Sequence, residues 1–516
     1  MKRVVIIGGG PAGLTTAYQL SKQKEEYEII LLEESNDFGG ISKTVKYNGN
    51  RMDIGGHRFF SKDQRIMNLW SEVMPVQSKP AYDYKKLNKH IELSEQGPDP
   101  EIDDNVMLVR QRVSRIYYKG KFFDYPISLK WDTIKSMGFL TTVCAGFSYL
   151  KAVVFKKAET NLENFYINRF GKKLYSMFFE SYTEKLWGRH PSEISADWGS
   201  QRVKGISIKA VIKDMLNKLA GKKNSKNTET SLIEQFWYPK FGPGQLWEKF
   251  AEIIEQNSAK ILLSHKVCKI NVENNVIKSV VCQTEKGEKV IEGDVFVSSM
   301  PVKDLVNSIN DNKSEEISKV ANGLPYRDFV TVGLLLNKLN IKNNTNIKTL
   351  GDIVPDCWIY VQDSDVKFVR IQIFNNWSPY MVKCPDNTVW IGLEYVCDEK
   401  DDIWTLSDED CISLAIKDLV KMGIIDEADV IDSHRERVNK AYPAYFDTYY
   451  QIDQVKNYLD NFENLYCVGR NGQHRYNNMD HSMLTAMITA DKIANNDSDK
   501  TDIWNVNTDK DYHEEK

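Results

Sequence analysis

The 516-residue sequence lacks any arrangement of cysteines that would indicate a metal site or a disulfide framework. Its eight cysteines are scattered, with no CxxC pair and no spacing typical of zinc ligands. Reduced thiols are typical of cytoplasmic proteins, and Met1 leads directly into a short strand without a signal-peptide cleavage site. We therefore expect a cytoplasmic protein that binds no metal.

The sequence also lacks an excess of charge of either sign. It contains 68 Lys and Arg residues against 72 Asp and Glu residues, a net charge of -4. This balance gives no general reason to expect nucleic acid or an anionic membrane as a partner, so any anion site must be local. The oligomeric state is not indicated by any pattern in the chain.

Long apolar runs are absent, with one borderline stretch between Met137 and Phe155. Its nineteen residues approach the minimum of about 20 for a membrane span, but they include Lys151, several Ser and Thr residues and two glycines. We therefore expect no transmembrane span. The stretch is interpreted either as a packed helix of a helical subdomain or as an interfacial helix that makes peripheral contact with a membrane.

What the sequence does contain begins with a βαβ pattern. A strand at Val4–Ile7 leads through glycines into a helix at Ala12–Lys22, and a second strand, YEIILLEES, follows. Helical spacing dominates from residue 70 to 247, interrupted by a polar surface loop at 221–230. Strand patterns then return before a last strand, NLYCVGR, near the end. The length predicts two domains, with three as the alternative.

The glycines after the first strand form a GxGxxG pattern with Gly8, Gly10 and Gly13, and Glu33 ends the next strand. In such a motif the first glycine permits a tight turn, the second lets the backbone approach a pyrophosphate, and the third lets helix pack on strand. The helix N-terminus presents N–H groups to the phosphates. An acid in the place of Glu33 accepts hydrogen bonds from ribose hydroxyls, so the pattern predicts a dinucleotide site.

Further glycines favour FAD over NAD as the cofactor. A pair at Gly39–Gly40, a pair at Gly55–Gly56 and a late strand ending at Gly469–Arg470 together resemble the glutathione-reductase-like flavoprotein superfamily, which includes amine oxidases, protoporphyrinogen oxidase and UDP-galactopyranose mutase. The resemblance implies FAD, bound non-covalently because no Cys or His is placed to attach it. Only one GxGxxG unit with its acid is visible, so NAD(P)H would bind transiently, as a reductant.

The resemblance implies an α/β fold with a glutathione-reductase-like Rossmann FAD-binding domain, an inserted helical subdomain and a β-sheet substrate-binding region. We expect a discontinuous FAD-binding domain at 1–69, 245–310 and 440–500, a helical insertion at 70–244, a mixed β-sheet substrate region at 311–439 and a flexible tail at 501–516. The residues implied to bind the cofactor are Gly8, Gly10, Pro11, Ala12, Gly13, Glu33, Glu34, Gly39, Gly40, Gly55, Gly56, His57, Val267, Gly469, Arg470 and Met479.

The block YTEKLWG at Tyr182–Gly188 resembles the YTEKQWG block of UDP-galactopyranose mutases. Five further blocks match that family in the same order: GGHRFF, FWYPKFGPGQLWEKF, LPYRDFV, VKFVRIQ and GRNGQHRYNNMDHSM. The resemblance implies an intramolecular transferase in which reduced flavin N5 attacks the anomeric carbon of a nucleotide- or diphosphate-linked sugar. The sugar ring then opens and recloses at a different size, without net redox change, in the synthesis of surface polysaccharides.

The same resemblance suggests the site residues. Arg370 would grip the diphosphate with Arg202 as a second cation, although either could form a structural ion pair instead, and Arg327 is interpreted as structural. His57 and Tyr476 complete the catalytic set, because His57 aligns with a histidine over the flavin. The substrate-binding set is Tyr182, Trp187, Tyr238, Arg370, Tyr449, Tyr450, Tyr476 and Asn478.

Departures from the mutase pattern keep other chemistry open. Asn478 stands where the family has an acid, Asp480 is displaced by one residue, and Phe60 or Ser61 replaces a second histidine. An FAD-dependent oxidoreductase of the protoporphyrinogen oxidase, amine oxidase or desaturase type is therefore the alternative. The apolar stretch ending at Phe155 favours a lipid-like substrate, whereas the arginines favour a diphosphate, and a polyprenyl diphosphate would satisfy both. A non-catalytic flavin scaffold needs only the cofactor motifs.

Overall fold

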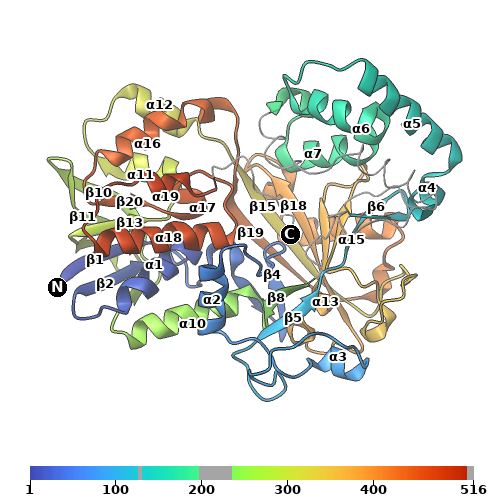
Figure 1. The fold of residues 1–516 in the computed structure, drawn as a ribbon, viewed down its shortest axis with the longest axis horizontal. Helices are drawn as coiled ribbons and strands as arrows, with labels where there is room; N and C mark the ends of the chain where they lie inside the picture. The colour runs from blue at the N-terminus through green and yellow to red at the C-terminus, as the bar shows by residue number, and fades with distance from the viewer. Residues whose placement is uncertain (126–130, 197–234, 508–516) are drawn as a thin grey trace. The chain divides into compact units, whose positions relative to one another are not determined.

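The computed structural model describes residues 1–125, 131–196 and 235–507, and these fall into two compact units (Figure 1). The first unit contains Met1–Val109, Trp237–Arg327 and residues 438–507. The second contains the described parts of Arg110–Phe236 together with Asp328–Arg437. Each unit has its own central sheet and its own core, and each is described by itself.

The first unit is built on a five-stranded parallel sheet. Its order is β20 (Leu465–Cys467), β13 (Val295–Ser298), β1 (Lys2–Ile7), β2 (Tyr27–Leu32), β9 (Lys260–Leu262). Ile7 lies opposite both Leu32 and Ser298, so the strands next to β1 end level with it. Parallel strands bring their carboxyl ends to one edge, and the first glycine loop therefore emerges there.

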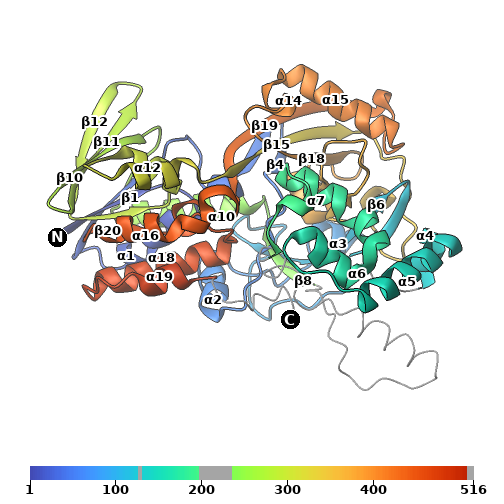
Figure 2. The ribbon, with the colours of Figure 1, turned by 90° about the horizontal axis from the view of Figure 1, so that it is seen from above.

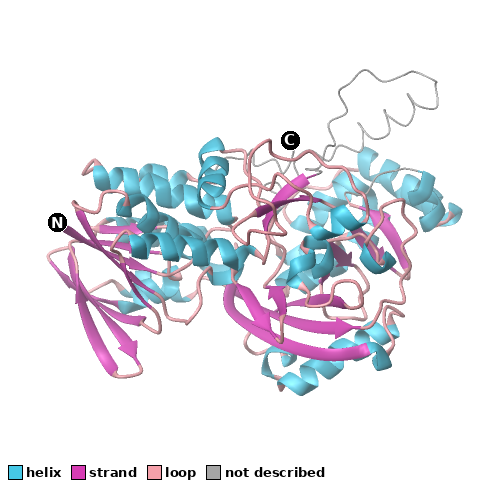
Figure 3. Ribbon diagram, turned by 90° about the horizontal axis from the view of Figure 1, so that it is seen from below, coloured by secondary structure: helices cyan, strands magenta, loops and turns pink. Residues whose placement is uncertain are grey.

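Alternate residues of β1 enter two different cores. Val4 and Ile6 pack in one core, whereas Val5 and Ile7 pack in the other, because successive side chains of a strand point to opposite faces. The first core is completed by α1 (Pro11–Ser21), α2 (Gln64–Val73), α10 (Pro243–Gln256) and α18 (Met479–Ala494). The second is completed by the helices α11 (Val302–Ser308), α12 (Glu315–Asn322) and α16 (Ile452–Asp460) and by a second sheet (Figure 3). In that sheet β10 (Lys266–Glu273), β11 (Val276–Thr284) and β12 (Gly287–Glu292) are antiparallel, and β14 (Ile309–Asn310) pairs with β10 in parallel.

The second unit is built on a seven-stranded mixed sheet. Its order is β19 (Val430–Pro443), β15 (Tyr326–Leu336), β18 (Val389–Cys397), β17 (Arg370–Ile373), β16 (Trp358–Val361), β6 (Ser114–Tyr118), β7 (Lys121–Asp124). One face is apolar: Val332, Ile371 and Leu393 pack there against Ala415 and Leu419 of α15 (Asp408–Lys421). Figure 2 shows α15 lying over β15 and β19.

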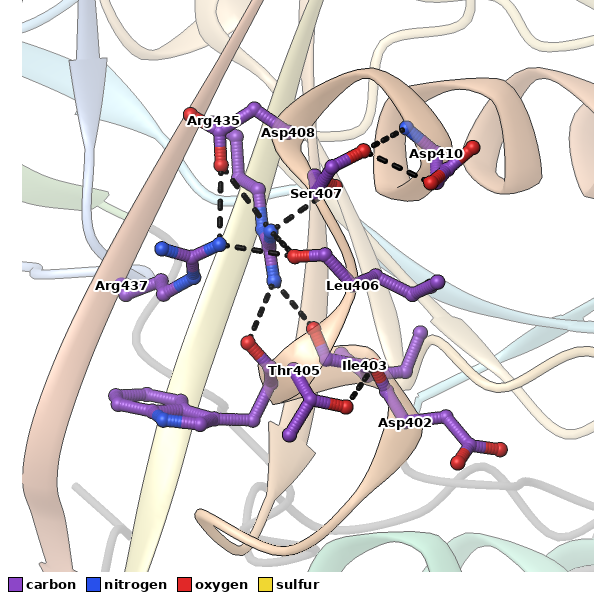
Figure 4. Close-up of polar contacts among 10 residues, drawn as sticks. Asp402, Ile403, Thr405, Leu406, Ser407, Asp408, Asp410, Arg435 and Arg437 are labelled. Carbon is purple, nitrogen blue, oxygen red and sulfur yellow. Dashed lines mark hydrogen bonds and ion pairs between the residues drawn. The ribbon is translucent and has the colours of Figure 1, made fainter.

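A buried arginine holds α15 over the sheet. Arg435 of β19 donates through Nη1 to the carbonyl oxygens of Leu406 at 2.7 Å and Ser407 at 3.2 Å, and to Oδ1 of Asp408 at 3.1 Å (Figure 4). Ser407 in turn accepts a hydrogen bond from the backbone N–H of Asp410 at 3.1 Å and caps α15. The connection from α14 (Asp402–Thr405) to α15 is thereby fixed to the sheet edge.

A group of helices completes the second unit: α4 (Trp131–Met137), α5 (Phe139–Val154), α6 (Leu162–Phe178) and α7 (Glu180–Trp187) (Figure 2). Inside α6, Gly171 has φ +77° and interrupts the helix. A Cβ there would lie 2.7 Å from the backbone nitrogen of Tyr149. Only glycine permits this approach of α6 to α5.

The α/β fold class is confirmed, but the boundaries differ from those expected. Residues 70–109 belong to the first unit, and the region expected to be helical contains β6 and β7. The two strands form a hairpin whose turn residues Lys119 and Gly120 have φ of +49° and +76°, a local turn signal that the helical interpretation missed. The flexible tail expected from residue 501 is wrong for α19 (Thr501–Asn505), which buries Trp504.

Candidate flavin and substrate sites

The loop between β1 and α1 has the geometry of a phosphate cradle. Gly8 has φ +108°, and a Cβ at Gly13 would lie 1.9 Å from the carbonyl oxygen of Gly8, so helix and turn approach as closely as backbone allows. Gly10 caps α1 without any side-chain hydrogen bond, and Pro11 follows at the first helical position. The N–H groups at the start of α1, beginning with Ala12, are therefore presented to an anion.

The second glycine pair faces the first loop. The backbone N–H of Gly39 donates to the carbonyl oxygen of Gly9 at 2.9 Å. Gly39 has φ +104°, and a Cβ there would lie 2.5 Å from the ring of Trp247. A Cβ at Gly10 would meet nothing nearer than the Cα of Gly40, at 3.9 Å. The gap beside Gly10 is thus bordered by backbone, which suits the close approach of a pyrophosphate.

Glu33 is held beside this loop by its own hydrogen bonds. One carboxylate oxygen accepts the N–H of Gly9 at 2.7 Å, and the other accepts the N–H and hydroxyl of Ser35 at 2.9 Å and 2.7 Å. Each carboxylate oxygen has two lone pairs, so this geometry is compatible with ribose binding. Glu34 instead forms an exposed ion pair with Lys266 at 3.5 Å, and the side chain of Val267 packs in a core.

The third glycine pair follows β4 (Asn50–Asp53), where Gly55 has φ +91° and a Cβ on it would lie 3.7 Å from the ring of His57. Beside it, the carboxyl of Asp53 is completely buried and accepts hydrogen bonds from the hydroxyls of Thr44 and Tyr238. Burial raises the pKa of Asp53 to about 7. Tyr238 was expected to bind substrate, but its side chain is fully buried on Asp53, and the structure gives it a core role.

The late glycine segment meets the start of α1. Gly469 opens α17 (Gly469–Gly472) with φ +77°, and a Cβ there would lie 2.8 Å from the Cβ of Ala12. Arg470 donates to the carbonyl oxygens of Ala441 and Asn477, both at 3.0 Å, and its guanidinium lies 4.0 Å from the ring centroid of Tyr476. The guanidinium that lies over Tyr476 therefore belongs to the residue directly after the glycine that meets α1.

Tyr476 belongs to an aromatic cluster with Tyr442, Tyr445 and Tyr449. Tyr442 and Tyr445 were not among the predicted site residues. Tyr442 stacks on Tyr476 with 5.5 Å between centroids, and Tyr445 stacks on Tyr449 at 4.4 Å and accepts the N–H of Tyr476 at 2.5 Å. Burial raises the pKa of Tyr449, whereas Tyr450 is exposed. The run KAYPAYFDTYY contains Tyr442, Tyr445, Tyr449 and Tyr450. The sequence does not distinguish Tyr442 and Tyr445 from the exposed Tyr450, whereas the ring stacking in the structure does.

Asn478 and Met479 begin α18. Asn478 accepts a hydrogen bond from the backbone N–H of His481 and donates its own N–H to the His481 ring at 3.2 Å, a reciprocal helix cap. The role shown for Asn478 is thus structural. Asp480 accepts a hydrogen bond from the hydroxyl of Ser61 at 2.9 Å, which ties the segment after His57 to the start of α18.

In the second unit, the polar face of the sheet carries Arg370. Arg370 lies opposite Tyr360 on β16 and Glu394 on β18, and facing residues of antiparallel strands share one side of the sheet. Its Nε and Nη2 both lie 2.6 Å from Oε2 of Glu394, whose side chain is fully buried and also accepts from Gln372. Arg370 itself is 20% exposed, so its guanidinium is held by Glu394 yet reaches the surface of the unit.

Rings gather around Tyr360, the residue opposite Arg370 on β16. Tyr182 of α7 meets Tyr360 edge-on at 5.8 Å between centroids, and Tyr125 lies 4.5 Å from Tyr360. Arg112 lies over Trp358 at 5.3 Å. The sequence pattern alone does not place Tyr360 beside Arg370, because that position depends on the pairing of β16 with β17.

Lys185 fixes the YTEKLWG block to the sheet. Its Nζ donates to the carbonyl oxygens of Val361, Asp363 and Phe368 at 3.1, 2.9 and 3.2 Å, and burial lowers its pKa to about 8. Trp187 is buried at the end of α7, where Gly188 adopts a left-handed conformation. The block therefore acts largely through packing and brings Tyr182 to the sheet. Arg202 lies outside the described residues.

Comparison with known proteins identifies the family. The model of the flavin-containing amine oxidoreductase family matches residues 11–494. This chain belongs to that family. The expected resemblance to its UDP-galactopyranose mutase branch is also confirmed at the level of fold, because a crystal structure of reduced UDP-galactopyranose mutase matches 98% of this chain and 99% of its own, with TM-score 0.75 and 20% identity.

Other known proteins are similar as well. The structure of a putative protoporphyrinogen oxidase from Exiguobacterium sp. 255-15 covers 96% of this chain and 99% of its own, with TM-score 0.65 and 15% identity. In sequence, a probable UDP-galactopyranose mutase from Klebsiella pneumoniae is 24% identical over 38% of this chain and 43% of its own length. A 1-hydroxycarotenoid 3,4-desaturase from Flavobacterium sp. is 22% identical over 58% of this chain and 57% of its own. The matches thus span about half of each curated relative.

Membership of the family implies a flavoenzyme that uses FAD, and the residues present fit that cofactor. The cradle of Gly10 and Gly40, the fixed carboxylate of Glu33 and the uncapped start of α1 supply the surface that a dinucleotide needs. Within residues 1–125, 131–196 and 235–507, no helix is long and apolar enough to cross a membrane.

Proposed function

We propose that this flavoenzyme acts on a sugar linked to a diphosphate and interconverts its ring forms without net redox change, in the synthesis of surface polysaccharides. The observation that carries the proposal is the polar face of the second unit, where the fully buried Glu394 holds Arg370. Reduced FAD would supply the electron-rich centre for this chemistry when bound. The protein must then bind the substrate, orient it and exclude water.

Arg370 suits the diphosphate. A guanidinium binds phosphate oxygens through paired N–H donors, and an orientation fixed in advance by Glu394 reduces the entropy lost on binding. Glu394 also accepts a hydrogen bond from the side-chain amide of Gln372. The carboxylate of Glu394 is thus held by two donors, and it keeps the guanidinium of Arg370 in place. Arg202, although outside the described residues, remains the second cation proposed for the diphosphate.

The rings beside Arg370 suit a sugar or a nucleobase. Tyr182, Tyr125 and Tyr360 combine apolar faces with hydroxyls, and such surfaces bind the C–H faces of sugars while their edges form hydrogen bonds. In the first unit, His57 and Tyr476 are proposed to contact the cofactor or the sugar, with Arg470 as a positioning residue that stacks on Tyr476. Tyr449 is proposed as a further phosphate contact.

The test uses purified, flavin-loaded protein. The flavin is reduced anaerobically with dithionite or NADPH, a panel of nucleotide sugars and polyprenyl-diphosphate sugars is added, and cyanoborohydride traps any adduct for mass spectrometry. A trapped flavin–sugar adduct that is lost in Arg370→Ala and retained in Arg437→Ala supports the proposal. Arg437 is a matched control, because it also pairs with a carboxylate, at 3.1 Å from Asp408, but its side chain is 40% exposed.

The alternative function is net oxidation by an FAD-dependent oxidoreductase of the protoporphyrinogen oxidase, amine oxidase or desaturase type. It is favoured by the fact that Glu394 already satisfies the charge of Arg370 within the chain, so that no anionic substrate is required. Absence of an adduct from every sugar, together with rapid reoxidation of the flavin by oxygen with release of peroxide, would replace the proposal by this alternative.

A further inference from the structure

Helix α5 exposes its large apolar side chains and buries its small ones. Eight of the fourteen large hydrophobic side chains exposed within the described ranges lie between residues 139 and 155. Phe139, Phe147 and Phe155 are 77%, 70% and 71% exposed. They share a face with Leu140, Val143, Leu150 and Val154 at helical spacing. An ordinary surface helix has the reverse arrangement.

The inner face of α5 explains why this orientation is stable. Ala145 and Ala152 are buried there, and the hydroxyl of Ser148 accepts the backbone N–H of Lys173 in α6 at 3.0 Å. Gly171 completes the close approach, since it has no Cβ to contact the backbone at Tyr149. Small residues and glycine therefore determine which face of α5 packs inward. The packing of this inner face on α6 turns the apolar face of α5 outward.

The charges along α5 and the residues next to it are of one sign. Between Asp132 and Glu159 the sequence contains four lysines, at positions 135, 151, 156 and 157, and no acidic residue, although the whole chain has a net charge of -4. All four lysines are exposed, as are Lys172 and Lys173 on the neighbouring α6. The apolar face of α5 is thus bordered by cations, which is the pattern of a helix that lies in the headgroup region of an anionic bilayer.

We propose that the outer face of α5, from Phe139 to Phe155, docks on an anionic lipid bilayer. The 16-residue helix is about 24 Å long, shorter than the roughly 30 Å hydrocarbon layer, so it lies in the plane of the interface. Its phenylalanine and leucine side chains enter the acyl boundary, and the lysines meet the lipid phosphates. A second copy of the chain is the poorer occupant, because pairing two such faces would bring their lysines together.

Sedimentation with vesicles tests the proposal. Flavin-loaded protein is mixed with vesicles of phosphatidylcholine alone or with phosphatidylglycerol, at low and at physiological salt. We expect binding to the anionic vesicles that weakens as salt rises. The variant Phe147→Asp/Leu150→Asp should lose binding, and Lys156→Glu/Lys157→Glu should weaken it on the order of tenfold or more. Both variants should keep the flavin content and thermal midpoint of the wild type, which would show that they fold.

Matched controls lie on β12 of the first unit and in the turn before it. Val290 is exposed to 59%, so Val290→Asp places one Asp at an exposed apolar position, and Lys286→Glu/Lys289→Glu repeats the charge reversal. Both should bind like the wild type. The proposal is overturned by absence of binding to phosphatidylglycerol vesicles, by equal losses in the controls, or by a dimer that Phe147→Asp/Leu150→Asp dissociates in the absence of lipid. It does not depend on the proposed reaction, since binding needs no substrate.

Discussion

The two central sheets carry candidate sites of different construction. At the ends of the parallel strands in the first unit, the site is made of backbone: Gly8, Gly10 and Gly13 shape it, and additional Cβ atoms at Gly8 and Gly13 would collide with their neighbours. On the face of the mixed sheet in the second unit, the site is made of side chains, centred on Arg370 and Glu394. A site made of backbone tolerates almost no change of residue, whereas a site made of side chains can change its ligand by substitution.

This contrast explains what family membership does and does not establish. The family's shared cofactor is bound by glycines whose conformations a few spacings describe. The substrate is recognised by side chains that differ between a mutase and a desaturase on a similar fold. The following experiments separate the two kinds of site, beginning with the largest expected effect.

The sharpest contrast within the flavin loop is between Gly13→Ala and Gly10→Ala. A methyl group at position 13 would collide with the Gly8 carbonyl oxygen, 1.9 Å away, so we expect a loss of at least about 3 kcal/mol of stability and little soluble protein. At position 10 the nearest atom is 3.9 Å away, so the protein should fold and lose flavin. Thermal unfolding and the ratio of flavin to protein absorbance measure both effects. Equal stability of the two variants would contradict this account.

Removal of Arg370 should affect the second unit and leave the flavin in place. Arg370→Ala leaves the carboxylate of Glu394 buried without its cation, which should cost about 3–5 kcal/mol in the free energy of unfolding. The double variant Arg370→Ala/Glu394→Gln should recover most of that loss, because no buried charge remains. Urea unfolding followed by circular dichroism measures the stability, and flavin absorbance gives the stoichiometry. A parallel loss of flavin would contradict the separation of the two sites.

Lys185→Met tests whether the YTEKLWG block acts through packing. The substitution keeps the volume of the side chain but leaves three carbonyl oxygens without their donor, so we expect a loss of about 2 kcal/mol. Flavin content should be unchanged, and binding of a sugar diphosphate should weaken because Tyr182 is no longer held beside Tyr360. The exposed Lys417→Met on α15 is the control. If both variants unfold alike, Lys185 does not have this positioning role.

The smallest expected effect is the pH dependence contributed by Asp53. Its pKa rises from 3.8 to about 7 on folding, so the folded state holds a proton that the unfolded state releases. The stability contributed is present below pH 4 and is lost as pH rises through 7. Asp53→Asn should remove this dependence. His474, whose pKa burial lowers to about 4, contributes in the opposite direction, so the difference between wild type and variant is the quantity to measure.

Much of the first unit was predictable because its signals are local. The spacing of Gly8, Gly10 and Gly13 next to an apolar strand, followed by Glu33, indicates strand, turn and helix without any knowledge of distant residues. The hairpin at Lys119 and Gly120 was also a local signal, but aromatic residues at apparent helical spacing obscured it. Element type was therefore easier to predict than element boundaries.

Contacts between distant residues could not be predicted in this way. Tyr238 lies 185 residues from Asp53 in the chain, and only the fold shows that its hydroxyl serves a buried carboxyl. The partner of Arg370 is 24 residues away, and the register of β17 on β18 decides that it is Glu394. A shift of one residue would turn Arg370 to the apolar face of the sheet.

The sequence by itself determined the class of cofactor and the α/β fold, because glycine spacing and hydrophobic periodicity are local consequences of backbone sterics and burial. Tertiary structure decided which side chains act together. It assigned Glu394 to Arg370 and Lys185 to three carbonyl groups, and it turned the apolar face of α5 outward. These outcomes depend on strand register and on how closely two helices can approach, and both are set by packing across the whole unit.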